Sequence, residues 1–336
     1  MRVGIIGLGR AGRIHLDAWQ TVHDARVCAI AERSGEIRRW AREAGLRAYA
    51  DPLEMIAREP LDAVSICTPP VSHAPLAVAC LGHNLNVLCE KPLALTRADA
   101  LRMLRAAARV ERHLLLATKF RHVPDVVRAR ELITQGEIGE PVAFEIDFSS
   151  KVDMSERWNS RRALAGGGVV IDNGCHAFDI VAFLFGTVSR VLATRLKPLQ
   201  DIGVEDSATI LVSASRGLVG RIDLSWSLNT GRESFVTVYG SGGTIEVGWR
   251  GSQLRRAGRS PVAIGTGYDK AEAHRRMLAS FQGLVAGDTP PWISAGECLR
   301  TVAAVEAAYV SLRSGGWVQV DMRRARERRP AFEASA

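Results

Sequence analysis

An aspartate and a histidine four positions apart, Asp172 and His176, are the residues in this sequence best placed for acid–base chemistry. If the segment from Val169 onwards is helical, both side chains lie on one face of that helix. A carboxylate beside an imidazole can orient a general base, or the two can bind a metal ion. The glycine run 166–168 would let the start of the helix approach a ligand closely. The sequence predicts a catalytic pair, with metal binding as an alternative for which no third ligand is evident.

A lysine at the end of a predicted strand is the next candidate. Lys91 follows the apolar run 86–89 and lies between Glu90, which can orient its ammonium, and Pro92, which fixes the backbone. A lysine at a strand end is usually solvated. This one shares the edge of the predicted sheet with a glycine-rich turn, so we expect it to act in the same site.

That turn contains three glycines, Gly7, Gly9 and Gly12, at the spacing G-x-G-x-x-G. The apolar run 3–6 before it predicts a buried strand, and residues 13–19 after it continue at helical period. In such a unit the glycines allow a tight turn, a close approach of backbone to a pyrophosphate, and close packing of helix on strand. The helix N-terminus also attracts phosphates. We predict a dinucleotide site.

An acidic residue at the end of the second predicted strand, 26–31, bears on the choice of cofactor. Glu32 stands about twenty positions beyond the glycines, where a carboxylate can accept both ribose hydroxyls of the adenosine. Such a carboxylate would repel a 2′-phosphate, which predicts NAD, with NADP less favoured. Arg33 follows and could stack on adenine or meet a phosphate.

Strand-like and helix-like segments alternate through the first third of the chain. Further strands are predicted at 61–67, 86–89 and 114–118, with helical segments between them. This alternation predicts a parallel sheet with helices on both faces, whose ligands bind at the carboxyl ends of the strands. The candidates that fall at those ends are Gly7, Glu32, Thr68, Glu90 and Lys91.

The rest of the chain has a different pattern. A strand at 142–148 alternates apolar and acidic residues, and strand-like runs separated by turns predict a mostly antiparallel sheet at 188–194, 208–213, 220–226, 235–239 and 244–247. Helices at 274–285 and 295–312 and a strand at 317–320 close the chain. We predict a dinucleotide-binding domain at 1–121, a second α/β domain at 122–320, and a basic tail at 321–336.

Composition places this chain of 336 residues among soluble globular proteins, and its length favours two domains. We expect neither a signal peptide nor a membrane span. The six cysteines form no C-x-x-C pair, as is typical of a reduced, cytoplasmic protein. A net charge of +8 could attract an anionic partner. Because the arginines are scattered, apart from a cluster in the tail, and no RNA- or DNA-binding motif is found, we expect no nucleic-acid partner.

With these motifs the sequence resembles the Gfo/Idh/MocA oxidoreductases, the glucose–fructose oxidoreductase and inositol dehydrogenase family. The resemblance covers residues 3–320 and rests on four motifs: G-L-G-R-A-G, T-P-P-x-x-H at 68–73, Glu90-Lys91-Pro92, and G-G-G-x-x-x-D-x-G-x-H-x-x-D at 166–179. It implies an N-terminal Rossmann domain and a C-terminal α/β domain for substrate binding. The mostly antiparallel open sheet of the latter usually forms the contacts of a homodimer or homotetramer.

The resemblance also implies roles for individual residues. Lys91, Asp172 and His176 correspond to the catalytic residues. Residues at positions that often contact substrate are Arg121, Trp158, Asn159 and Arg161. Residues expected to bind the cofactor are Gly7, Gly9, Arg10, Ala11, Gly12, Glu32, Arg33, Thr68, Pro69, His73, Glu90 and Lys91. No metal is expected.

The predicted activity is hydride transfer between a nicotinamide cofactor and a secondary hydroxyl or ketone of a sugar, an inositol or a nucleotide sugar, which could be anionic. In the oxidative direction His176 would take the hydroxyl proton while Asp172 holds its ring, and Lys91 would stabilise the oxyanion. Because fold does not fix function, a catalytically silent, NAD(P)-sensing regulatory protein is the alternative.

Overall fold

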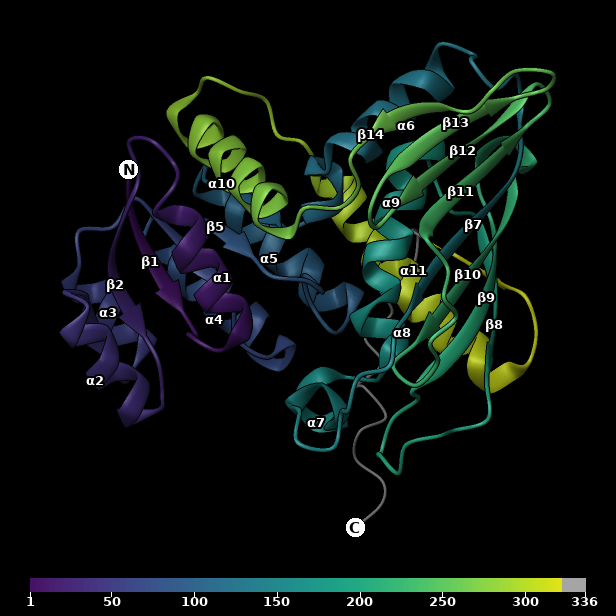
Figure 1. Cartoon of the computed structure of the whole chain (residues 1–336). Helices are drawn as coiled ribbons and strands as arrows, with labels where there is room; N and C mark the ends of the chain where they lie inside the picture. Colours follow the sequence, from purple (N-terminus) through teal and green to yellow (C-terminus); the bar gives the residue numbers. More distant parts are fainter. Residues whose placement is uncertain (322–336) are drawn as a thin grey trace.

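The computed structural model of the chain describes residues 1–321, which fold around two β-sheets (Figure 1). The first sheet is parallel throughout, in the order β3-β2-β1-β4-β5-β6. Its strands are β1 (Arg2–Ile6), β2 (Arg26–Ala31), β3 (Arg47–Tyr49), β4 (Ala63–Ile66), β5 (Asn86–Cys89) and β6 (Leu114–Leu116). The strand order reverses between β1 and β4, the point at which doubly wound sheets open a ligand crevice. The tail from residue 322 lies outside the described residues.

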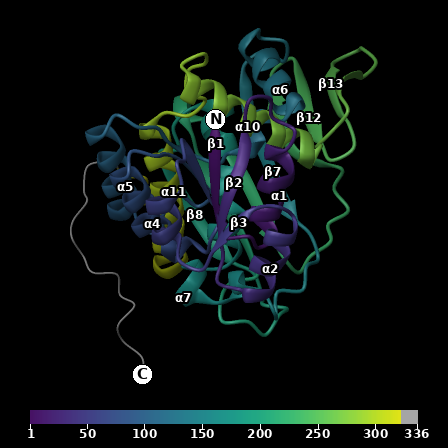
Figure 2. The same ribbon diagram turned by 90° about the vertical axis from the view of Figure 1, so that its left-hand side faces the viewer.

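Helices cover both faces of this sheet (Figure 2). They are α1 (Arg10–Trp19), α2 (Gly35–Glu43), α3 (Pro52–Arg58), α4 (His73–Gly82) and α5 (Arg97–Arg109). Three begin at a side-chain cap that accepts a free backbone N–H: Ser34 for α2, Asp51 for α3 and Thr96 for α5. The predicted Rossmann-type alternation is confirmed.

The second sheet is mixed, in the order β14-β13-β12-β11-β7-β10-β9-β8-β15, and β7 and β10 pair in parallel while the other pairs are antiparallel. Its strands are β7 (Pro141–Ser149), β8 (Arg190–Arg195), β9 (Ser207–Ser213), β10 (Val219–Ser225), β11 (Ser234–Gly240), β12 (Gly243–Gly248), β13 (Ser252–Arg256), β14 (Val262–Gly265) and β15 (Val318–Gln319). The predicted mostly antiparallel sheet is confirmed, whereas β13, β14 and β3 were not predicted.

Helices lie on the face of the second sheet that is turned toward the first sheet (Figure 1). They are α6 (Pro124–Thr134), α8 (Val169–Asp172), α9 (Gly174–Phe185) and α11 (Ala295–Ser314), whereas the short α7 (Arg162–Ala165) packs against the 3₁₀ turns Pro70–Ser72 and Trp158–Ser160. The prediction of one continuous helix from Val169 is wrong. The segment forms two helices, α8 and α9, and the helical segments on either side of Asn173 meet at a bend of 43°. No single helix within residues 1–321 is long and apolar enough to cross a membrane.

One late helix returns to the first sheet. Helix α10 (Lys270–Ala286) buries Met277, Leu278 and Phe281 in the same apolar core as β1 and α1. The rings of Phe281 and Trp19 meet edge to face with centroids 6.4 Å apart. The strands of the first sheet thus lie before residue 121 and those of the second sheet lie after it. The apolar core around the first sheet nevertheless includes side chains of α10, far beyond residue 121.

Candidate active site

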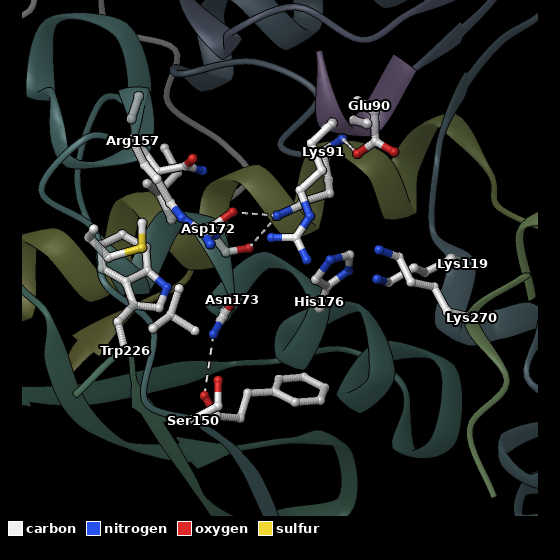
Figure 3. A pocket seen from close by; sticks show the side chains of 18 of the residues that line it. Glu90, Lys91, Lys119, Ser150, Arg157, Asp172, Asn173, His176, Trp226 and Lys270 are labelled. Carbon is white, nitrogen blue, oxygen red and sulfur yellow. Dashed lines mark hydrogen bonds and ion pairs between the residues drawn. The ribbon is translucent and has the colours of Figure 1, made fainter. Parts of the chain in front are cut away.

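A cleft of about 730 Å³ lies between the two sheets, a size typical of small-molecule sites. One wall comes from the glycine turn and from the segments that follow β4, β5 and β6. The opposite wall comes from the second sheet and from α8 and α9 (Figure 3). Lys91, Asp172 and His176, which lie far apart in the sequence, all line it.

The lysine after β5 and the aspartate at the end of α8 form an ion pair across this cleft. Lys91 Nζ donates to Asp172 Oδ1 at 2.5 Å and to the carbonyl oxygen of Asp172 at 3.0 Å. Burial acts to lower the pKa of Lys91, but the carboxylate of Asp172 outweighs it and raises this pKa above its ordinary value. The ammonium therefore stays protonated at neutral pH, and its direction is fixed.

The histidine of the predicted pair is oriented differently from our expectation. Within residues 1–321 the ring of His176 has no hydrogen bond to Asp172, which is committed to Lys91, and it packs edge to face on Phe120 with centroids 5.1 Å apart. The expectation that Asp172 holds this ring is thus wrong, because the break at Asn173 separates the two side chains. Burial, followed by the charges of Lys91 and Lys119, holds the pKa of His176 well below its usual value. The imidazole is neutral at pH 7.

Two further histidines lie behind the lysine. His15 Nε2 is 3.1 Å from Glu90 Oε1, and Glu90 Oε2 accepts the backbone N–H of Lys91 at 3.0 Å. Burial acts to raise the pKa of Glu90, but His15 and Lys91 lower it below its usual value. His274 completes the group, and the possible ligand atoms of His15, Glu90 and His274 lie within 4.8 Å of one another. These three could hold a metal ion; Asp172 and His176 belong to no such group among the described residues.

The glycine turn has the shape that a pyrophosphate requires. Gly7 has φ +86°, and a Cβ on Gly12 would stand 2.0 Å from the carbonyl oxygen of Gly7, so both positions need glycine. At Gly9 a Cβ would meet nothing within 4 Å, and this residue lines the cleft together with Arg10 and Ala11. Gly9 is also the N-cap of α1 and has no side-chain cap, which leaves the N–H groups of this helix end available for a phosphate.

The residues expected near the adenosine lie beside this turn. Glu32 Oε2 accepts the N–H of Leu8 at 2.7 Å, and Oε1 accepts the N–H of Ser34 at 3.0 Å, so the carboxylate is fixed at the end of β2. Each oxygen keeps a lone pair for a ribose hydroxyl. Glu32 and Arg33 lie outside the lining of the cleft.

The residues of the T-P-P-x-x-H motif have two different positions: some line the cleft, and others hold the segments around it in place. Thr68 lines the cleft. His73 is fully buried, with Nδ1 2.8 Å from the carbonyl oxygen of Pro92 and Nε2 2.8 Å from that of Thr68. His73 thus connects the segments after β4 and β5 rather than facing a ligand, which corrects its expected contact with the cofactor. Pro69 does not line the cleft either.

Of the four residues expected to contact substrate, two reach the cleft. Trp158 and Asn159, in a short 3₁₀ turn, line it. Arg121 does not: its side chain is 3% exposed and forms ion pairs of 2.8 Å with both Asp179 and Glu297. It is a core residue because α9 and α11 surround it with carboxylates. Arg161, at the exposed N-cap of α7, also lies outside the lining.

A buried glutamate that sequence reasoning missed holds the glycine run in place. Glu205 Oε1 accepts N–H groups from Gly168 at 2.9 Å and Val170 at 3.2 Å, and the hydroxyl of Tyr309 at 2.6 Å. A Cβ on Gly168 would come within 2.1 Å of the carbonyl oxygen of Glu205. This contact explains the need for glycine and fixes the start of α8, at whose end Asp172 lies.

Two lysines in the cleft were also missed. Lys119 and Lys270 extend toward His176 (Figure 3) and line the cleft. Burial, and then the charge of Lys91, lowers the pKa of Lys119 to about 8. Neither lysine belongs to a motif with a spacing of its own, so only the fold could reveal them. The aromatic residues that line the cleft are Phe120, Phe148, Trp158, Trp226, Trp249 and Tyr268.

Comparisons with known proteins agree with this geometry. A model of the oxidoreductase family with an NAD-binding Rossmann fold matches residues 1–118, and a model of the GFO/IDH/MocA C-terminal domain matches residues 126–246. The chain is 31% identical over 335 residues to D-apiose dehydrogenase of Paraburkholderia graminis, covering 94% of this chain and 88% of that protein. It is 31% identical over 252 residues to myo-inositol 2-dehydrogenase of Thermotoga maritima, covering 73% and 74% of the two chains.

Solved structures share the fold over nearly the whole chain. An oxidoreductase from Agrobacterium radiobacter in complex with NAD+, L-tartaric acid and magnesium superimposes with a TM-score of 0.84, at 25% identity, over 95% of this chain and 98% of that one. A levoglucosan dehydrogenase in complex with NADH has a TM-score of 0.88 at 21% identity, over 96% and 99% of the two chains.

Proposed function

Because this chain belongs to the Gfo/Idh/MocA family of oxidoreductases, it is an NAD(P)-dependent dehydrogenase acting on CH–OH groups, and we propose that it oxidises a secondary hydroxyl of a sugar, an inositol or a nucleotide sugar. One observation carries the proposal: the glycine turn and the side chains of Lys91, Asp172 and His176 face the same cleft. The names of the relatives, which include apiose and inositol dehydrogenases, support a polyol. The aromatic lining offers flat surfaces on which the apolar face of a sugar ring can pack.

The electrostatics of the cleft support a division of roles between these side chains. His176 is the base, since its neutral imidazole can accept the hydroxyl proton. Lys91 stays protonated and stabilises the negative charge that develops on the substrate oxygen. Asp172 acts by holding the Lys91 ammonium in position. A bound nicotinamide supplies the hydride acceptor.

We further propose NAD as the cofactor in preference to NADP. The free N–H groups at the start of α1, with Gly9 and Arg10, would hold the pyrophosphate. The fixed carboxylate of Glu32 would accept the adenosine ribose hydroxyls and repel a 2′-phosphate. Two of the solved structures with this fold hold NAD+ or NADH, which supports the same choice, and the name of another refers to NADPH dependence.

A homodimer or homotetramer in the cytoplasm is the assembly that we propose. The outer face of the second sheet carries the exposed apolar side chains of Leu211, Val219 and Tyr239 on three of its strands. Such a face is suited to a second copy of the chain. The six cysteines are all free, and five of them are buried, which supports a reducing compartment.

The test is a screen of inositols, aldoses and nucleotide sugars with NAD and with NADP, followed by the absorbance of the reduced cofactor. We expect turnover with NAD on at least one polyol, and Lys91→Met and His176→Ala should each lower kcat by about two to four orders of magnitude. Exposed residues outside the cleft provide matched controls, Lys197→Met and His23→Ala, which should leave turnover unchanged. Tight NADH binding without turnover on any substrate would contradict the proposal.

A further inference from the structure

A lysine in the inner part of the cleft has no acidic partner. Lys119 begins the 3₁₀ turn Lys119–His122 after β6, and its ammonium lies 5.3 Å from the ring centroid of Phe120 and 5.5 Å from that of Tyr268. Figure 3 shows it extending toward His176. Within residues 1–321 no carboxylate lies within ion-pair distance of Lys119. Two aromatic rings are its nearest attractive contacts, and these stabilise a cation by only about 0.5–2 kcal/mol.

Other charges of the cleft already have partners. Asp172 is paired with Lys91, and the two oxygens of Glu90 contact His15 Nε2 at 3.1 Å and the backbone N–H of Lys91 at 3.0 Å. Arg232 lies 2.9 Å from a carboxylate oxygen of Glu145. Among the described residues, no carboxylate of the lining therefore forms an ion pair with Lys119.

The remaining cations have another explanation. Arg10 belongs to the glycine turn and Lys270 is close enough to it for their charges to repel, so the pyrophosphate proposed above would bring negative charge to both. Arg157 is half-buried, and its charge attracts the nearby carboxylate of Asp153. Lys119 is left as a half-buried ammonium without an ion-pair partner, because Glu90 and Asp172 act on it only from beyond ion-pair distance. An ammonium taken out of water without a counter-ion is unfavourable, and the depressed pKa of about 8 is one expression of this cost.

We propose that the substrate supplies the missing charge: it is a sugar acid whose carboxylate binds Lys119 while its reacting hydroxyl lies between Lys91 and His176. The inference rests on the dehydrogenase function proposed above and narrows its substrate class. A carboxylate is favoured over a phosphate because one uncompensated ammonium matches one negative charge. The rings of Phe120 and Tyr268 exclude water from the pair, which strengthens it.

The experiment compares matched pairs of ligands, each a uronic or aldonic acid and its parent neutral sugar, on the wild-type enzyme with bound NADH. Quenching of tryptophan fluorescence measures binding without turnover, since Trp158, Trp226 and Trp249 line the cleft. We expect at least one acid to bind more tightly than its neutral parent. Lys119→Met should weaken that acid by about 10- to 100-fold, the range for a hydrogen bond to a charged group, and leave the neutral sugar within a few-fold. Lys119→Arg should retain the preference, and Lys197→Met should be silent.

The pH dependence provides an independent readout. The preference for the acid should fall as pH rises above about 8 in the wild type, because Lys119 loses its proton, and should persist to higher pH in Lys119→Arg. The inference is overturned if every neutral sugar binds at least as tightly as its acid, or if a sugar phosphate binds at least as tightly as the acid. So would a Lys119→Met variant with normal thermal stability whose NADH affinity falls, since Lys119 would then serve the cofactor. If neutral sugars are oxidised and acids are not, this inference fails while the dehydrogenase proposal stands.

Discussion

Two glycines of the same turn should respond in opposite ways to the addition of one methyl group. In Gly12→Ala the new Cβ would stand 2.0 Å from the carbonyl oxygen and 3.0 Å from the carbonyl carbon of Gly7, which are backbone atoms that cannot rotate away. Overpacking of this kind costs roughly 1–3 kcal/mol. In Gly9→Ala the methyl would meet nothing within 4 Å, and φ is −69°, which alanine adopts readily. Only the modest difference between glycine and alanine as an N-cap remains, about 1 kcal/mol or less.

Two measurements separate these effects. Thermal unfolding without ligand should show the melting temperature of Gly12→Ala lowered by roughly 2–12 °C, at about 2–4 °C per kcal/mol, and that of Gly9→Ala lowered by less. Titration with NADH, followed by its fluorescence, should show Gly9→Ala weakened by at least about tenfold, because its methyl occupies the space through which a pyrophosphate approaches. Gly35→Ala, where a Cβ would have only a distant arginine nitrogen nearby at 3.8 Å, is the matched control and should change neither.

The reasoning is refuted if Gly9→Ala binds NADH as tightly as the wild type, since the phosphates would then lie elsewhere. It is equally refuted if the two variants lose the same thermal stability. Loss of NADH binding in Gly12→Ala alone would indicate that the turn is only a structural feature.

Two further predictions concern the catalytic wall. Burial, and then the charges of Lys91 and Lys119, depress the pKa of His176, so kcat/KM for a neutral substrate should decline only when pH falls below the ordinary histidine range. The Lys119→Met substitution removes one repulsive charge and should move this decline to higher pH. A pH profile that does not move would argue against His176 as the base. Glu205→Ala removes an oxygen that accepts three hydrogen bonds, so it should lower the free energy of unfolding, measured in urea, by roughly 2–4 kcal/mol. It should also reduce kcat because Asp172 is displaced, and Glu205→Gln should have a smaller effect on both quantities. Unchanged stability and kcat in both variants would rule out this positioning role.

Much of the first domain could be predicted because its elements carry strong local signals. The glycine turn and most of the buried strands are visible in the sequence. Strand β3 was missed because it has three residues, and β13 because its residues Ser252–Arg256 are mostly polar. Such strands form because a neighbouring strand pairs with them, which no local pattern reports.

The sequence predicted which three residues would share the candidate site better than it predicted the contacts between them. Lys91, Asp172 and His176 do share a cleft, but the partner of Asp172 is a lysine 81 positions away rather than the histidine four positions away. Helical spacing favoured the local pair, and the break at Asn173 removed it. Arg121 illustrates a different limit: the family resemblance implied a substrate contact, yet Asp179 and Glu297 approach its side chain in the folded chain and pair with it.

The position of α10 has a consequence for how the protein is made. Met277, Leu278 and Phe281 complete the apolar core around β1 and α1, although synthesis delivers them long after residues 1–121 have left the ribosome. Until the last quarter of the polypeptide is translated, the N-terminal segment therefore lacks the apolar side chains that pack beside Trp19. Helix α10, one of the last elements to be translated, thus completes the core that supports the glycine turn.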